Sequence, residues 1–97
     1  MTRAEILEKL EALGDDPAAK LSELGIRGKR RNPFSCPLAR YLLREGATRP
    51  SVGVDLKRSG TTVGEVGAMY VILPKESPVA RFRLDFDNGK YPDLEAP

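Results

Sequence analysis

The hydrophobic pattern of this 97-residue chain changes its period near residue 50. Before that point, apolar residues recur every three or four positions, as they do along the buried face of an α-helix. After it, Val52, Val54 and Leu56 alternate with small or polar residues, which is typical of a half-buried β-strand. Helices followed by an antiparallel hairpin predict an α+β fold, in which N-terminal helices pack on a small antiparallel β-hairpin or sheet within one domain, residues 1–97.

Three helices are expected ahead of the strands. Thr2 and Glu5 have the spacing of a capping box in front of an amphipathic stripe, which predicts a helix over residues 3–13. Proline in the first turn, where its missing N–H group is not needed, predicts shorter helices over residues 17–24 and 37–45. The first two helices should form a helical hairpin that covers one side of the strands.

The segment after the first strand is expected to complete a β-hairpin. Ser59 and Gly60 suit a tight turn, and one long, interrupted return strand is expected over residues 61–67 and then 68–73. A bulge at Gly64 or Gly67 would direct Val66 back to the core. The nearly continuous apolar run at residues 69–73 predicts the most buried strand of the molecule.

Residues 78–87 are compatible with two structures. Their alternation of apolar and polar residues favours a strand, whereas Ser77 ahead of a proline is typical of a helix start and Gly89 of a helix end. The helix is preferred because its apolar residues would share one face: Val79, Phe82 and Phe86. We therefore expect a C-terminal helix, or in the alternative a third strand, to close the fold, with Tyr91 and Leu94 packed against the body.

Positive charge is concentrated in one segment, although the net charge of the chain is only +2. Residues 24–44 contain six Lys or Arg residues and no acid. Such a patch can attract anionic partners even when the total charge is small. The candidate anion-binding residues lie in this segment and at the tip of the predicted hairpin: Arg27, Lys29, Arg30, Arg31, Arg40, Arg44, Lys57 and Arg58.

A non-catalytic binding or regulatory role fits this patch in two ways. In the preferred one, the basic surface contacts nucleic acid, because three helices followed by a β-hairpin resemble the outline of a winged helix. The roughly ten residues between the second and third helices are the objection, since a helix-turn-helix uses a turn of about 3–4. In the alternative, the chain is an interaction module that binds an acidic protein or self-associates through residues 69–73. Phe34 and Tyr41 could stack on bases, but core packing is the simpler explanation.

Cys36 would be the nucleophile of a third possibility, a small enzyme. A thiol at a helix start beside arginines has a lowered pKa, which favours the reactive thiolate. The chain has no histidine to act as its base, and free cysteine is commonly buried, so we expect a core residue and no enzyme. One cysteine without histidine cannot form a zinc site within the chain, and the aspartates near the C-terminus lack the spacing of a calcium loop, so no metal or cofactor is predicted.

Short signatures are spread over most of the chain: Cys36-Pro37-Leu38-Ala39-Arg40-Tyr41-Leu42, Leu73-Pro74, Phe82 with Phe86-Asp87, Gly89, and Tyr91-Pro92-Asp93-Leu94. In this combination the chain resembles small proteins encoded in actinobacterial genomes. The resemblance implies a soluble intracellular protein and favours the helical structure for residues 78–87, but it implies no activity.

The composition also predicts where the protein works. No apolar run approaches the roughly 20 residues that are needed to cross a bilayer. The charged N-terminal segment lacks the apolar core of a signal peptide, and a single cysteine gives no disulfide framework. We therefore expect a cytoplasmic protein with no membrane association.

Overall fold

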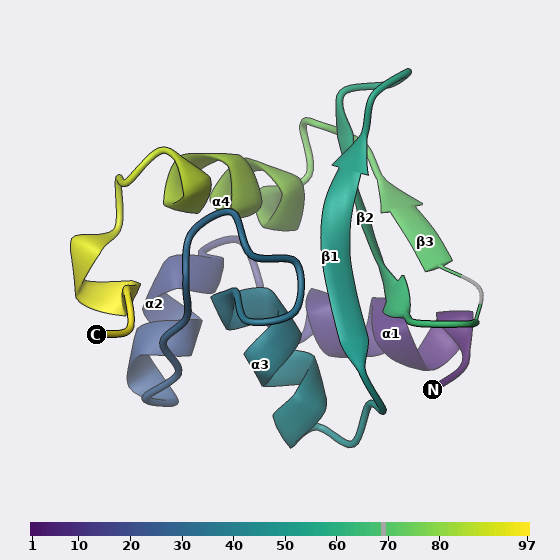
Figure 1. Cartoon of the computed structure of the whole chain (residues 1–97), viewed down its shortest axis with the longest axis horizontal. Helices are drawn as coiled ribbons and strands as arrows, with labels where there is room; N and C mark the ends of the chain where they lie inside the picture. The colour runs from purple at the N-terminus through teal and green to yellow at the C-terminus, as the bar shows by residue number, and fades with distance from the viewer. Residues whose placement is uncertain (69) are drawn as a thin grey trace.

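The computed structural model of the chain describes residues 1–68 and 70–97 and has an α+β fold, as the sequence predicts (Figure 1). Over these residues the elements are α1 Arg3–Glu11, α2 Pro17–Glu23, α3 Pro37–Arg44, β1 Pro50–Asp55, β2 Gly60–Glu65, β3 Tyr70–Leu73, α4 Pro78–Asp87 and the 3-10 helix η1 Pro92–Leu94. In the same two ranges, no helix combines the length and the apolar character that a membrane span requires.

The helix starts use the side chains that the sequence singles out. Thr2 and Glu5 form both bonds of the capping box at α1, and the hydroxyl of Ser77 accepts the N–H of Ala80 at the start of α4. The helical interpretation of residues 78–87 is therefore confirmed, and α4 turns its apolar face to the core: Val79, Phe82 and Phe86. The first three helices end one or two residues earlier than predicted.

Within the described ranges, the sheet is antiparallel with the order β1-β2-β3, so β1 and β3 are both edge strands. Val52, Val63 and Val71 lie side by side across it and are buried. They face the helical layer, since α3 packs against β1, α4 against β2 and α1 against β3. On the opposite face Tyr70 and Ile72 are exposed, so the helices cover the sheet on one side only.

Three predictions about the strands are wrong. β3 is not the most buried strand, because only alternate residues of a strand point inward when one face of the sheet is open; Met69 of the predicted strand lies outside the described residues. β2 and β3 are separate strands joined by a turn in which Gly67 has a φ of +82°, and Val66 is exposed instead of buried. The hairpin turn occupies residues 56–59, which places Leu56 at the exposed tip.

The C-terminal tail packs against the body as expected. The rings of Phe82 and Phe86 stack with centroids 5.9 Å apart, and Tyr91 tilts against Phe82 at 5.2 Å. Leu94 of η1 is buried in the same core as the apolar face of α3. The tail therefore reaches the segment between α2 and α3, where the sequence places most of the candidate basic residues.

Candidate functional site: a basic loop beside an apolar groove

Residues 27–31, called the basic loop below, are fixed by the C-terminal tail. The N–H of Gly28 donates to the carbonyl of Leu94 at 2.9 Å, and the carbonyl of Gly28 accepts the N–H of Ala96 at 2.8 Å. On its other side Gly28 lies against the start of α3, where an added Cβ would be only 2.4 Å from the nitrogen of Pro37. The loop is thus clamped between the tail and α3, and this position requires glycine.

Arg31 has a backbone conformation that is costly for a residue with a side chain. Its φ is +54°, in the left-handed region, where strain of about 1 kcal/mol or more is expected. Its N–H donates to Oδ1 of Asp87 at 2.9 Å, and Oδ2 of Asp87 lies 3.5 Å from Nη1 of Arg83. Nε of Arg83 in turn donates to the hydroxyl of the fully buried Thr61 at 3.0 Å. A series of polar contacts from β2 through α4 therefore holds Arg31 in place.

An apolar groove of about 420 Å³ lies between the basic loop, β1 and α4. Buried side chains contribute to its lining, among them Leu38, Phe82 and Phe86. Val54 and Leu84 also line it while remaining 49% and 51% exposed. Arg31 lies at the loop side of the same groove. The site thus combines an accessible apolar surface with a positive charge.

Cys36 also lines the groove, but it is a buried helix cap. Its Sγ accepts the N–H of Ala39 at 3.4 Å. Burial raises the pKa of the Cys36 thiol, and the negative charge of Asp87 acts in the same direction. The lowering that a helix start and nearby arginines would produce is therefore outweighed, and the thiol is protonated at neutral pH. The expectation of a core cysteine is confirmed.

Arg40 and Arg44 support the fold from α3. Nη1 of Arg40 donates to the carbonyl of Arg27 at 3.2 Å, and Nη1 of Arg44 donates to the carbonyl of Leu24 at 3.0 Å. The two guanidinium groups thus satisfy carbonyls just beyond the end of α2. The hydrogen bond from Arg40 to the carbonyl of Arg27 also fixes the beginning of the basic loop.

The other candidate residues are spread over the molecule. Lys57 and Arg58 lie at the hairpin tip, which Figure 1 shows at the opposite end of the sheet from the C-terminal end of α3. Arg58 lies 3.6 Å from Asp55, and Nε of Arg30 lies 3.1 Å from the carboxylate of Glu95. In the basic loop, three exposed side chains form no ion pair with a described residue: Arg27, Lys29 and Arg31.

Several residues of the site are not among those predicted from the sequence. Arg83 and Asp87 are two of them. Their separation by four positions on a helix predicts an ion pair, so this contact could have been found from the sequence. Core packing is confirmed for Tyr41, whose hydroxyl donates to the carbonyl of Lys9 at 2.7 Å. The prediction of core packing is wrong for Phe34, which is 58% exposed because it lies in the connection between α2 and α3, away from the core.

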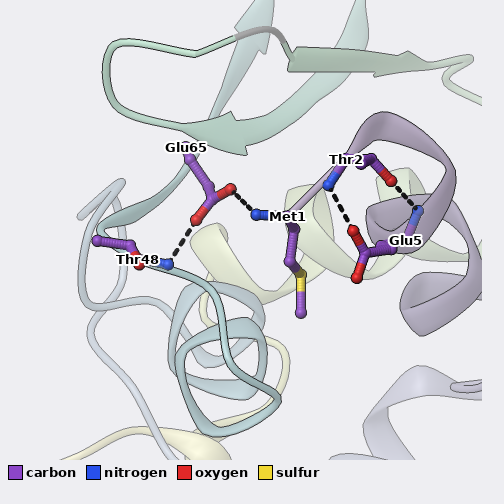
Figure 2. Close-up of polar contacts among 5 residues, drawn as sticks. All are labelled: Met1, Thr2, Glu5, Thr48 and Glu65. Carbon is purple, nitrogen blue, oxygen red and sulfur yellow. Dashed lines mark hydrogen bonds and ion pairs between the residues drawn. The ribbon is translucent and has the colours of Figure 1, made fainter.

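A second polar cluster joins α1 to the sheet (Figure 2). The carboxylate of Glu65, at the end of β2, pairs with the amino group of Met1 and accepts the N–H of Thr48. The side chains of Met1 and Glu65 are both less than a tenth exposed. The hydrogen bond between them raises the pKa of the amino group of Met1 and lowers the pKa of Glu65, and the N–H of Thr48 lowers the latter further. This cluster fixes the sheet to α1.

We expect Glu65→Gln to destabilise the protein most between about pH 4.3 and pH 8, where both groups are charged even in the unfolded chain. A lowered pKa of Glu65 means that its contribution is lost as the pH falls through the folded-state value. A raised pKa of the Met1 amino group means that its contribution is lost as the pH rises through the folded-state value. Urea midpoints of the variant and the wild type should therefore converge at both extremes.

The exposed Glu76 gives the control for this prediction. Glu76→Gln should follow the wild-type midpoint at every pH, because neither the hydrogen bond nor the ion pair involves it. A gap between Glu65→Gln and the wild type that stays constant with pH would contradict the assignment.

Comparison of the chain with protein-family models, curated proteins and solved structures gives no match. What the site can bind is therefore argued from its residues and their contacts.

Proposed function

We propose that this chain is a non-catalytic binding protein that uses the basic loop and the adjoining groove to hold an acidic protein partner. The observation that carries the proposal is Arg31, an exposed arginine kept in a strained backbone conformation by Asp87. Glycine would remove the strain at no steric cost. Arg49 has a similar φ outside the groove, so it is the position of the strained Arg31 on the groove that points to binding.

The groove gives this charge an apolar neighbour. Protein interfaces combine a desolvated apolar centre with a polar rim, and arginine is enriched in them. Val54 and Leu84 provide apolar surface, while Arg27, Lys29 and Arg31 provide positive charge without an acid partner among the described residues. A partner segment that presents aliphatic side chains next to carboxylates matches both parts of the site.

Replacing Arg31 with glycine should separate folding from binding. We expect the free energy of unfolding to rise by about 1 kcal/mol, because glycine adopts a positive φ without strain. We expect the affinity for an acidic peptide to fall about tenfold, a loss of about 1.4 kcal/mol. The probe is a capped glutamate–valine peptide in which pairs of valines alternate with pairs of glutamates, labelled for fluorescence anisotropy, and stability is measured by urea denaturation.

Arg49→Gly is the matched control, because Arg49 also has a positive φ, of +53°, but does not line the groove. It should gain stability as Arg31→Gly does and keep the affinity of the wild type. Equal peptide affinity for Arg31→Gly and the wild type would refute the role of Arg31. Failure of the wild type to bind the peptide at low salt would refute the proposed function.

Nucleic acid is the second candidate partner, and Phe34 favours it. Exposed aromatic rings beside basic residues stack on unpaired bases, and Phe34 lies three residues after Arg31. Nucleic acid is the weaker candidate because Arg40 and Arg44 donate to backbone carbonyls, and because the basic hairpin tip lies at the opposite end of the sheet from the C-terminal end of α3. Binding of an oligothymidylate in preference to the peptide, with affinity that falls steeply with salt, would favour it.

A further inference from the structure

The strand that borders the groove is an edge strand whose outer side is only partly covered. The N–H of Val52 donates at 2.9 Å to the carbonyl of Pro33, which lies outside the sheet. Backbone groups of alternate residues in an antiparallel edge strand point to the same side. The N–H and C=O of Val54 therefore also point away from β2, and no described residue outside the sheet bonds to them.

Val54 also lines the groove of the site described above. Val54, which has an unpaired backbone donor and acceptor, thus lines one groove together with Leu84 and Arg31. Asp87 does not neutralise this arginine side chain, because its oxygens contact the N–H of Arg31 and Nη1 of Arg83. The combination fits a ligand with backbone amides, an aliphatic side chain and a carboxylate.

We propose that the partner binds as an extended segment that adds a further strand to the sheet along β1. This rests on the proposed function and adds its mode of binding. A residue of the partner exchanges both backbone hydrogen bonds with Val54, as in strand addition to other exposed sheet edges. Because side chains alternate along a strand, the partner residue opposite Val54 and the residues two positions from it turn toward the groove. One of them places an aliphatic group against Leu84 and another places a carboxylate near Arg31.

The contact at Pro33 fixes where the added strand begins. The carbonyl of Pro33 already occupies the position that a strand residue would take beside Val52. The partner therefore pairs with Val54 and continues toward the hairpin tip. The phosphodiester backbone of a nucleic acid has no N–H group to donate to the carbonyl of Val54, so this edge favours a polypeptide.

Val54→Pro tests the backbone bond. Proline removes the N–H of Val54 but leaves the hydrogen bonds to β2, Arg31 and most of the groove in place, since proline is tolerated in edge strands where the N–H faces outward. We expect the affinity for the glutamate–valine peptide to fall about tenfold. Val54→Thr keeps the N–H and the branched shape, so its loss of affinity measures the side chain alone and should be clearly smaller than that of Val54→Pro.

Amide hydrogen exchange gives a second measurement, made on the wild-type protein. The N–H of Val54 should exchange more slowly when the peptide is bound, because it then donates to the added strand. Wild-type affinity in Val54→Pro, or unchanged exchange at Val54 in the complex, would overturn strand addition and leave the proposed function intact. Absence of peptide binding to the wild type would overturn both.

Discussion

Replacing Gly28 with alanine is expected to destabilise the protein by about 3 kcal/mol or more. The added Cβ would lie 2.4 Å from the nitrogen of Pro37, 2.5 Å from the carbonyl carbon of Cys36 and 2.5 Å from the oxygen of Ser35. All three are backbone atoms, so rotating a side chain cannot relieve the clash. The basic loop must move away from α3, and the hydrogen bonds that join it to the tail are strained at the same time.

Urea and thermal unfolding measure this loss, which should lower the thermal midpoint by at least about 10 °C in a domain of this size. Gly14→Ala is the matched control, because Gly14 has a φ of +72° but an added Cβ there meets nothing within 4 Å. It should cost only about 1 kcal/mol, through backbone strain alone. Equal losses of stability in Gly28→Ala and Gly14→Ala would show that the clash of an added Cβ with the start of α3 does not destabilise the protein.

Phe86→Ala should cost about 3–5 kcal/mol, the range typical of removing a buried aromatic side chain. Phe86 is 1% exposed, stacks on Phe82 and lines the groove. The substitution leaves a cavity between α4 and α3 that the surrounding backbone fills only in part. We therefore also expect weaker binding of the glutamate–valine peptide at temperatures where the variant is still folded.

Leu84→Ala on the same helix provides the comparison. Leu84 is 51% exposed, so the free energy of unfolding of the variant should remain within about 0.5 kcal/mol of the wild-type value. Because it also lines the groove, its peptide affinity should fall while the fold is kept. A large loss of stability in Leu84→Ala, or a loss below about 1 kcal/mol in Phe86→Ala, would contradict this division of α4 into a structural and a binding face.

The helices were predictable because their signals are local. Thr2 and Ser77 bond to amides three residues along the chain, so sequence spacing alone identifies these helix starts. The strands were less predictable, since burial depends on which face the helices cover. The apolar pattern of Tyr70 and Ile72 does not reveal that their side of the sheet is open.

For the candidate site, the sequence predicts only which basic residues are present. The concentration of basic residues is visible in the sequence, but the contacts that assign their roles are long-range: Arg31 meets a carboxylate 56 residues away. Arg40 and Arg44 look equivalent to Arg31 in the sequence, yet their guanidinium groups are bonded to carbonyls of the chain. Charge patterning identifies a basic segment, whereas tertiary contacts decide which of its charges can meet a partner.

The hydrogen bonds between Gly28 and the C-terminal tail can form only late in the synthesis of the chain. Synthesis proceeds from the N-terminus, so the basic loop emerges from the ribosome well before Leu94 and Ala96, to which Gly28 bonds. Contacts of such large sequence separation form late, after the shorter-range ones. If the proposed partner recognises the clamped loop, we expect it to bind only chains in which residues 94–96 have already been made.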